Sequence, residues 1–561
     1  MMRRRTSHSV GALLLLLVAR GAPSAGSPAS GTLARPRLEG SASGRPREPQ
    51  AAFGRRQATS GAQLLKLLAG DGVAYSQFGI SVAVSSDGAR VVVGAGGYYD
   101  DDELGSQFGS AYVLDGATGE RLLKLVASDG AQFDSFGYSV AVSSDGARVV
   151  VGSVYDDDQA STTGSAYVFN GTTGERLLKL VASDGAANDY FGDSVAVSSD
   201  GARVVVGATG DDDQGANSGS AYVLDGATGE RLFKLVASDG AAGDSFGYSV
   251  SVSSDGARVV VGATGDDDQG TNSGSAYVFD GTTGERLLKL VASDAAAYSK
   301  FGNSVAVSSD GARVVVGACQ DDDQGVYSGS AYVLDGTTGE RLLKLVASDG
   351  AQLDRFGYSV AVSSDGARVV VGSFYDSDQG TAFGSAYVFN GTTGERLLKL
   401  VASDGAANDY FGDSVAVSSD GARVVVGAMN DDDQGTNSGS AYVFDFTEAT
   451  TETTTATTTK TATTTTDTGT SSTTTATTTK TATTTTDTGM SSDTSNTTAT
   501  TEPWGLIAVF AGVLILFLVC CVALGCLVKR RRGRSPRPER GIDNAEVKDN
   551  EYNESEQVAE I

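Results

Sequence analysis

Histidine is almost absent from this sequence, and cysteine is scarce. The single histidine among 561 residues is His8, close to the N-terminus. Sites built on histidine, such as Ser-His-Asp triads and histidine-ligated zinc centres, are therefore excluded from the rest of the chain. Of four cysteines, Cys520, Cys521 and Cys526 lie in one apolar run, which leaves Cys319 alone. The part before that run must be stable without disulfides.

Positive charge is also in short supply. Lys and Arg number 42 against 69 Asp and Glu, which gives a formal net charge of −27. A protein that neutralises nucleic-acid phosphates needs a basic face, whereas the basic residues here are scattered along the chain. Nucleic acid is therefore excluded as a partner, and cations or basic surfaces are the expected ones.

Two apolar runs near the ends predict a membrane protein. In residues 1–25, Arg3, Arg4 and Arg5 precede the apolar run GALLLLLVA, and small residues follow it, which is the pattern of a secretory signal peptide. Residues 504–528 contain no charge and are followed at once by KRRRGR, which predicts a transmembrane helix with a cytoplasmic flank. We expect a single-pass type I protein of the plasma membrane, extracellular before the helix and cytoplasmic at residues 529–561.

The pair Phe-Gly recurs at regular intervals once in each of seven repeats, with one spacing of 58 residues and five of 55, at Phe78, Phe136, Phe191, Phe246, Phe301, Phe356 and Phe411. Each repeat has four short apolar stretches divided by turn signals, as in SVAVS, ARVVVGA, GSAYVLD and RLFKLVA of residues 191–240. Asp-Gly after the first stretch suits a tight two-residue hairpin turn, because glycine accepts a positive φ. Four antiparallel strands at this period predict an all-β fold, a seven-bladed β-propeller over residues 63–446.

The two ends of the repeat array indicate a closed ring. The array begins at residues 63–68 (QLLKLL) with a fourth-type strand that has no blade before it. It ends at residues 439–446 (GSAYVFDF) with a third-type strand that no fourth strand follows. We therefore expect the N-terminal strand to complete blade seven, which makes 28 strands. An open solenoid, the rival architecture, needs no such permutation.

Phe-Gly, the Asp-Gly hairpin, VVVGA and GSAYVF together resemble the FG-GAP repeat of integrin alpha-subunit propellers and of related microbial propeller proteins. The resemblance covers residues 63–446. Three departures argue against a true integrin subunit. SSDGARV, with Asp200 alone, replaces the DxDxDGxxD calcium loop of the first hairpin; Gly207-Ala208-Thr209 lacks the Pro of GAP; and the tail begins KRRRGR, without GFFKR.

Two further segments are biased in composition. Residues 26–62 are rich in Arg, Pro, Gly and Ser, with little to bury, and are expected to be disordered. Residues 447–503 are mostly Thr and contain one 20-residue unit twice, which resembles an O-glycosylated, mucin-like stalk. Three N-x-T sequons on the extracellular side predict N-glycosylation at Asn170, Asn390 and Asn496.

The loop between the second and third strands concentrates carboxylates in every repeat. Oxygen-only loops of this kind could hold Ca²⁺, which takes six to eight oxygen ligands. The alternative is a solvated loop whose Asp side chains cap turns. Both interpretations stay open, and the candidate metal ligands are Asp100, Asp101, Asp102, Asp156, Asp157, Asp158, Asp211, Asp212, Asp213, Asp266, Asp267, Asp268, Asp321, Asp322, Asp323, Asp376, Asp378, Asp431, Asp432 and Asp433.

One lysine recurs in each fourth strand, where we expect it to protect the outermost edge of the blade against pairing with another sheet. The seven lysines are Lys66, Lys124, Lys179, Lys234, Lys289, Lys344 and Lys399.

Strand directions also predict the faces of the propeller. The acidic loops and the loops from blade to blade should share one face, while the SSDGAR and (D/N)G(A/T)TGER turns share the other.

These features predict a non-enzymatic cell-surface protein for binding or adhesion. Integrin-like propellers bind ligand on the face that bears the acidic loops, so the resemblance implies an extracellular protein or glycan ligand there, with calcium as the one candidate cofactor. Nearly identical loops in all blades argue against an active site, which needs a unique constellation. The alternative from another class is a structural surface coat or an acidic cation-binding scaffold without a specific partner.

Overall fold

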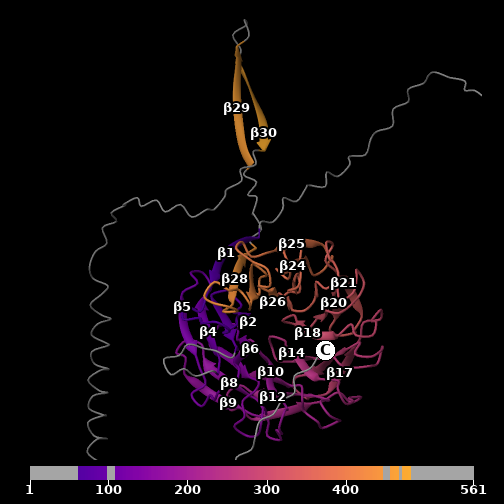
Figure 1. Ribbon diagram of the computed structural model, residues 1–561. Helices are drawn as coiled ribbons and strands as arrows, with labels where there is room; N and C mark the ends of the chain where they lie inside the picture. Colours follow the sequence, from indigo (N-terminus) through magenta and orange to yellow (C-terminus); the bar gives the residue numbers. More distant parts are fainter. Residues whose placement is uncertain (1–60, 98–107, 447–454, 466–470, 482–561) are drawn as a thin grey trace, which may run out of the picture. The chain divides into compact units, whose positions relative to one another are not determined.

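The computed structural model describes residues 61–97, 108–446, 455–465 and 471–481, and all regular secondary structure in these ranges is β. Within them, 28 strands form seven four-stranded antiparallel sheets. Figure 1 shows the sheets as blades around a central axis, with the first strand of each blade innermost and the fourth outermost. The predicted seven-bladed propeller is confirmed.

The strands are equivalent from blade to blade. The first strands are β2 (Phe78–Val84), β6 (Phe136–Val142), β10 (Phe191–Val197), β14 (Phe246–Val252), β18 (Phe301–Val307), β22 (Val360–Val362) and β26 (Phe411–Val417). The second strands are β3 (Arg90–Ala95), β7 (Arg148–Ser153), β11 (Arg203–Ala208), β15 (Arg258–Ala263), β19 (Arg313–Ala318), β23 (Arg368–Ser373) and β27 (Arg423–Ala428).

The third strands are β4 (Ser110–Asp115), β8 (Ser165–Asn170), β12 (Ser220–Asp225), β16 (Ser275–Asp280), β20 (Ser330–Asp335), β24 (Ser385–Asn390) and β28 (Ser440–Asp445). The fourth strands are β5 (Arg121–Leu125), β9 (Arg176–Leu180), β13 (Arg231–Leu235), β17 (Arg286–Leu290), β21 (Arg341–Leu345), β25 (Arg396–Leu400) and, for blade seven, β1 (Ala62–Leu67).

The hydrophobic core lies between the blades. In β11, Val204 and Val206 pack in a cluster with residues of blade two, whereas Val205 packs with residues of blade four. All three side chains have no exposed surface. The second strand is therefore a continuous apolar run because both of its faces are covered, as in a sheet buried on both sides.

The N-terminal strand closes the ring, as expected. β1 pairs antiparallel with β28, with Leu65 opposite Val443 and Leu67 opposite Ala441. The three leucines of β1 are buried to different extents: Leu67 is 1% exposed, Leu65 is half-buried and Leu64 is 43% exposed. The outermost strand turns one side to solvent, so Leu67 is the leucine of β1 that lies fully in the core, with Leu65 packed partly against it.

The Phe-Gly pair has a steric origin. Phe191 is fully buried, and Gly192 has a φ of 99° at an irregularity where β10 meets β11. A Cβ on Gly192 would lie 2.3 Å from the carbonyl oxygen of Ser165 in the neighbouring blade. Only glycine combines this φ with so close a backbone contact.

The first hairpin differs from the expected two-residue turn. The backbone N–H of Ser198 donates to the carbonyl of Arg203 (2.9 Å), which encloses the four residues 199–202, and Gly201 alone among them has a positive φ, of 70°. The Asp200 carboxylate accepts from the Ala202 N–H (2.9 Å) and the Ser198 hydroxyl (2.7 Å). The turn is longer because this aspartate side chain closes it.

Beyond the propeller, β29 (Thr455–Thr465) and β30 (Ser471–Thr481) form an antiparallel pair from the two copies of the Thr-rich unit. This pairing was not expected of an extended stalk. Contacts divide the chain into two compact units, residues 1–449 and 450–561. Among the described residues no helix is long and apolar enough to cross a membrane. The predicted signal peptide, the predicted helix at 504–528 and residues 26–60 of the segment at 26–62 that we expected to be disordered lie outside the described residues, whereas Ala62 at the end of that segment begins β1.

Candidate functional site

Loop contacts establish the two faces of the propeller. The N–H of Gly243, in a loop from blade to blade, donates to the carbonyl of Ala216 in an acidic loop (2.9 Å). The N–H of Gly226, in the turn after a third strand, donates to the carbonyl of Ala202 in a first hairpin (2.8 Å). The predicted arrangement is thus confirmed. We call the first side the acidic face and the second the turn face.

The first aspartate of each acidic loop is a structural group. Asp211 is buried, and its Oδ2 accepts a hydrogen bond from the Tyr222 hydroxyl (3.0 Å) and lies 2.7 Å from Lys234 Nζ. The third aspartate, Asp213, is exposed but also lies 2.7 Å from the same Nζ. One ammonium group therefore joins two carboxylates of the loop.

The same arrangement recurs in six blades, with distances from the lysine Nζ to the first aspartate of 2.7 to 3.2 Å. Residues Asp100, Asp101 and Asp102 of blade one lie outside the described residues. The triads of first aspartate, third aspartate and lysine are Asp156, Asp158 and Lys179; Asp211, Asp213 and Lys234; Asp266, Asp268 and Lys289; Asp321, Asp323 and Lys344; Asp376, Asp378 and Lys399; and Asp431, Asp433 and Lys66.

A further aspartate links each blade to the next. Asp184 follows the fourth strand of blade two, yet its carboxylate lies 3.0 Å from Arg231 and 3.2 Å from Lys234 in blade three. Equivalent links start from Asp71, Asp129, Asp239, Asp294, Asp349 and Asp404. The fourth-strand lysines therefore do more than protect an outer edge, because six of them hold carboxylates of two blades together; for the seventh, Lys124, the acidic loop of its own blade lies outside the described residues.

The titration behaviour follows from these contacts. Burial by itself would lower the pKa of Lys66, but hydrogen bonds to Asp433, Asp404 and Asp431 outweigh burial and raise it. For Asp266 burial acts in the opposite direction and would raise the pKa, while the hydrogen bond from Lys289 and that from the Asp268 N–H lower it overall. Lys66 and Asp266 therefore both stay charged at neutral pH.

As arranged, the carboxylates do not fit a calcium ion. Calcium needs six to eight oxygen ligands, whereas here an ammonium group occupies the point where the carboxylates converge. No cluster of three or more His, Cys, Asp or Glu side chains suited to a metal occurs in the described part of the chain. Calcium binding stays a prediction, and it would require the lysine to move away.

The second aspartate of the triplet faces solvent and contributes to the loop in another way. Asp212 is exposed, and its Oδ1 accepts from the backbone N–H of Asn217 (2.7 Å) within the same loop. Asp267, Asp322 and Asp432 repeat this contact, and Asp157 is exposed as well. These carboxylates cap the loop and still present negative charge on the acidic face.

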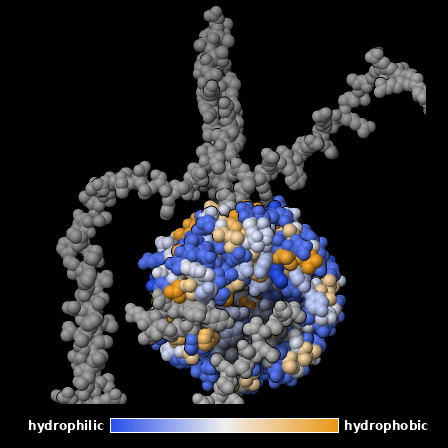
Figure 2. Space-filling model, viewed as in Figure 1, coloured by the Kyte–Doolittle hydropathy of each residue, from blue (hydrophilic) through white to orange (hydrophobic). Residues whose placement is uncertain are grey.

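Bulky side chains in left-handed backbone stand beside these carboxylates, a feature that strand patterns do not reveal. Three residues before each Phe-Gly the backbone φ is positive, and Asn188, Gly243 and Asn408 suit such a φ. The other four loops hold large exposed side chains at this position. The propeller surface as a whole is mostly hydrophilic, with separate hydrophobic spots (Figure 2). These four are Tyr75 (φ 67°, 46% exposed), Phe133 (φ 76°, 51%), Tyr298 (φ 70°, 50%) and Leu353 (φ 74°, 45%).

The glycosylation sequons within the propeller lie on the turn face. The Asn170 side-chain oxygen accepts from the N–H groups of Thr172 (2.9 Å) and Thr173 (3.0 Å), and Asn390 does the same with the equivalent threonines. β28 ends on this face too, since the N–H of Phe446 donates to the carbonyl of Ala422 (2.6 Å). Asn496 lies outside the described residues, and glycosylation stays a prediction.

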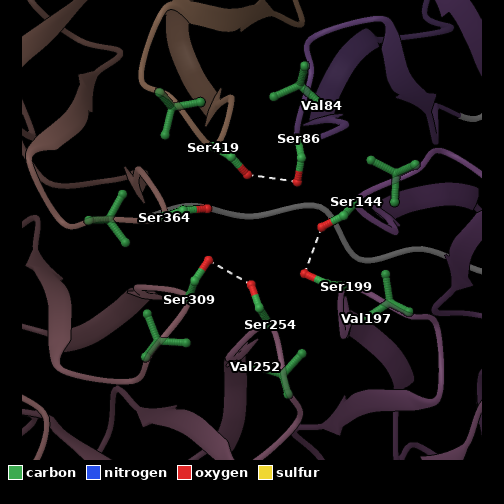
Figure 3. A pocket seen from close by; sticks show the side chains of 14 residues that line it. Val84, Ser86, Ser144, Val197, Ser199, Val252, Ser254, Ser309, Ser364 and Ser419 are labelled. Carbon is green, nitrogen blue, oxygen red and sulfur yellow. Dashed lines mark hydrogen bonds between the residues drawn. The ribbon is translucent and has the colours of Figure 1, made fainter.

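The central channel has a serine ring at its turn-face end (Figure 3). Seven backbone N–H groups donate to the serine carbonyl of the next blade in an unbroken circle, which closes with Ser419 donating to Ser86 (3.1 Å). The hydroxyls pair as Ser144 with Ser199, Ser254 with Ser309 and Ser419 with Ser86, at 2.6 to 2.7 Å. Seven is odd, so Ser364 has no hydroxyl partner in this ring. The ring surrounds a cavity of about 200 Å³.

Comparison with a model of a known repeat family agrees with this architecture. The model of the FG-GAP repeat family matches residues 62–114, 121–169, 176–224, 231–279, 286–334, 341–389 and 396–444. Each match runs from a fourth strand through the third strand of the next blade, the same permutation by which β1 closes the ring. Among solved structures, hydrazine synthase of Kuenenia stuttgartiensis aligns with 15% identity and a TM-score of 0.44, over 63% of this chain and 92% of that chain. No match was found among curated proteins. The seven matched segments span most of the propeller, and the chain belongs to the FG-GAP repeat family.

Proposed function

We propose that this protein is a non-enzymatic cell-surface protein for binding or adhesion, and that the acidic face binds an extracellular protein or glycan. The FG-GAP propeller fold is compatible with such a role. The cell-surface location rests on the signal peptide and the membrane helix, both predicted from sequence outside the described residues.

The observation that carries the proposal is the set of exposed bulky side chains at positive φ. A left-handed backbone costs a residue with a Cβ roughly 1 to 2 kcal/mol, and three equivalent loops avoid most of this cost with Asn or Gly. The side chains of Tyr75, Phe133 and Tyr298 are about half exposed, so each of them leaves a large aromatic surface open to solvent. Strained, exposed aromatic residues beside carboxylates suit contact with a partner.

The test replaces the four bulky residues with those that the chain itself carries at the same position: Tyr75→Asn, Phe133→Asn, Tyr298→Asn and Leu353→Gly. We expect this variant to stay folded, because its new residues suit a positive φ, and to lose binding of the full chain to arrays of extracellular proteins and glycans. A second variant, Asp212→Ser with Asp267→Ser and Asp322→Ser, removes exposed charge from three adjacent blades and should also lose binding.

The matched control lies on the turn face, as Glu120→Gln, Glu175→Gln and Glu230→Gln, and should bind like the parent. Binding that survives both acidic-face variants but is lost in this control would refute the assignment. Weak binding of many cations without saturation, and of no macromolecule, would favour the alternative of an acidic scaffold.

A further inference from the structure

The residue after each Phe-Gly pair differs from blade to blade, although its neighbours hardly change. The next residue is serine in all seven repeats. These positions lie at the start of the innermost strands, so they come together around the channel at its acidic-face end. In blade order they are Ile80, Tyr138, Asp193, Tyr248, Asn303, Tyr358 and Asp413.

They line a cavity of about 300 Å³, which is at the lower end of the range for small-molecule sites. The serines beside them are occupied in joining blades: the Ser139 hydroxyl donates to the carbonyl of Gly192 (2.8 Å), and Ser81 Oγ accepts from the Val140 N–H (3.0 Å). Asn303 is occupied as well, since its amide donates to the carbonyls of Gly357 and Tyr358. The two aspartates and the rings of Tyr138 and Tyr248 remain for a ligand, together with the side of the Tyr358 ring that does not pack against Phe374, whose centroid is 4.3 Å away.

The two aspartates are not matched by positive charge. Asp413 is 7% exposed, and its Oδ1 has no hydrogen-bond partner among the described residues. Asp193 accepts one hydrogen bond, from the Thr209 hydroxyl (3.0 Å). Burial raises the pKa of Asp413 to about 7 and that of Asp193 to about 6. An unpaired carboxylate in such a place is costly, and a bound cation would remove the cost.

Three tyrosines complete the lining. The carboxylate of Asp413 is the largest cause of the raised pKa of Tyr358, and both aspartates contribute, after burial, to the raised pKa of Tyr248. The tyrosines and carboxylates therefore share one electrostatic environment. Aromatic faces attract cations, above all ammonium groups in desolvated sites.

The chain offers no cation of its own to this cavity, because neither lysine nor arginine is among the described residues that line it. Two basic residues, Lys300 and Arg355, stand one residue before a Phe-Gly pair, and both are engaged elsewhere. Lys300 donates to the side-chain oxygen of Asn272 (3.2 Å), and the Arg355 guanidinium lies over the Tyr327 ring at 5.2 Å from its centroid. A neutral polyol would leave the carboxylates uncompensated.

We propose that the acidic-face end of the central channel binds a small organic ammonium ion, held by the carboxylates of Asp193 and Asp413 and by the tyrosine rings between them. This site is separate from the loops of the acidic face, and its test does not depend on a macromolecular ligand.

The experiment titrates the full chain by calorimetry with choline, with its neutral isostere 3,3-dimethylbutanol and with methyl glucoside. We expect saturable binding of choline at one site, and binding of the isostere weaker by about tenfold or more, since it lacks the charge. This comparison needs no variant. No binding of choline, or equal binding of choline and the isostere, would overturn the proposal, as would stronger binding of methyl glucoside.

Variants assign the site to the channel. Asp413→Asn places in blade seven the residue that blade five carries at this position, and it removes an unpaired buried charge, so the variant should fold and melt no lower than the parent. With Asp413→Asn or Asp193→Asn, choline affinity should fall by about tenfold. Asp432→Asn, on an exposed loop, is the matched control and should leave affinity unchanged. Unchanged affinity in both channel variants would place the binding elsewhere and refute the proposal.

Discussion

Closure of the ring by β1 makes a sharp prediction, because Leu67 and Leu64 lie in one strand but in opposite environments. Leu67 is 1% exposed and packs with Phe78, Val91 and Tyr112 of blade one, whereas Leu64 is 43% exposed. Leu67→Ala should lower the free energy of unfolding by about 2 to 5 kcal/mol, the range for a leucine removed from a packed core. Leu64→Ala should change it by no more than about 0.5 kcal/mol.

An internal blade supplies the matched comparison. Leu290 has the place of Leu67 in blade four and is also 1% exposed, but its strand follows the third strand directly in sequence. If β1 is docked as a true fourth strand, Leu290→Ala and Leu67→Ala should cost similar free energies. Since a domain is stable by only about 5 to 15 kcal/mol, either change is a large part of the total.

The assay is urea denaturation of the full chain, followed by far-ultraviolet circular dichroism, for the parent and the three variants. The midpoint should fall for Leu67→Ala and Leu290→Ala and stay in place for Leu64→Ala. A midpoint that falls only for Leu290→Ala would show that β1 does not close the ring. Equal effects at Leu64 and Leu67 would refute the burial pattern of the strand.

Three further predictions concern charge and hydrogen bonding. Burial raises the pKa values of Asp134, Asp354 and Asp409 to about 6. Between about pH 7.5 and 5 the folded state therefore binds protons that the unfolded state has released. The melting temperature should rise as the pH falls through this range. Replacing these three with Ser, the residue at positions 76 and 299, should flatten that dependence, and a parent that melts lower at pH 5 would contradict it. Lys234→Met leaves buried Asp211 without its cation and should lower the free energy of unfolding by about 3 kcal/mol. Millimolar Ca²⁺ should then raise the melting temperature of this variant more than that of the parent. Equal responses to Ca²⁺ would speak against competition between lysine and calcium. Ser309→Ala breaks a hydroxyl pair and should lower the free energy of unfolding, measured by urea denaturation, by about 1 kcal/mol. Ser364→Ala breaks no hydroxyl pair and should lower it by less. The reverse order would contradict the pairing.

The fold could be predicted in detail because its signals are local and repeated. Alternating and continuous apolar stretches marked the four strands, and the orphan strand at one end with the missing strand at the other required closure by β1. The two faces followed from strand direction alone. The hairpin was predicted too short, since the pattern SSDG does not reveal that Asp200 caps a four-residue loop.

The candidate site was predicted only in part. The acidic loops were found as repeated triplets, but triplets do not show which oxygen is buried or what it contacts. Asp211 and Asp212 are neighbours in sequence, yet one is bound to Lys234 and the other faces solvent. The lysine in each blade was assigned to its strand edge, because the carboxylate that reaches it from the preceding blade, such as Asp184, is 50 residues away.

By itself the sequence therefore determined the repeat, the strands, the closure and the acidic composition of one face, all of which depend on residue type and spacing. The tertiary structure alone decided which charges neutralise each other and which stay unpaired. Packing brings seven first strands to one axis, so that Asp193 and Asp413, 220 residues apart (413 − 193), line one cavity with the tyrosines. Distance along the chain carries no information about such a meeting, because each residue is placed by the blade that holds it.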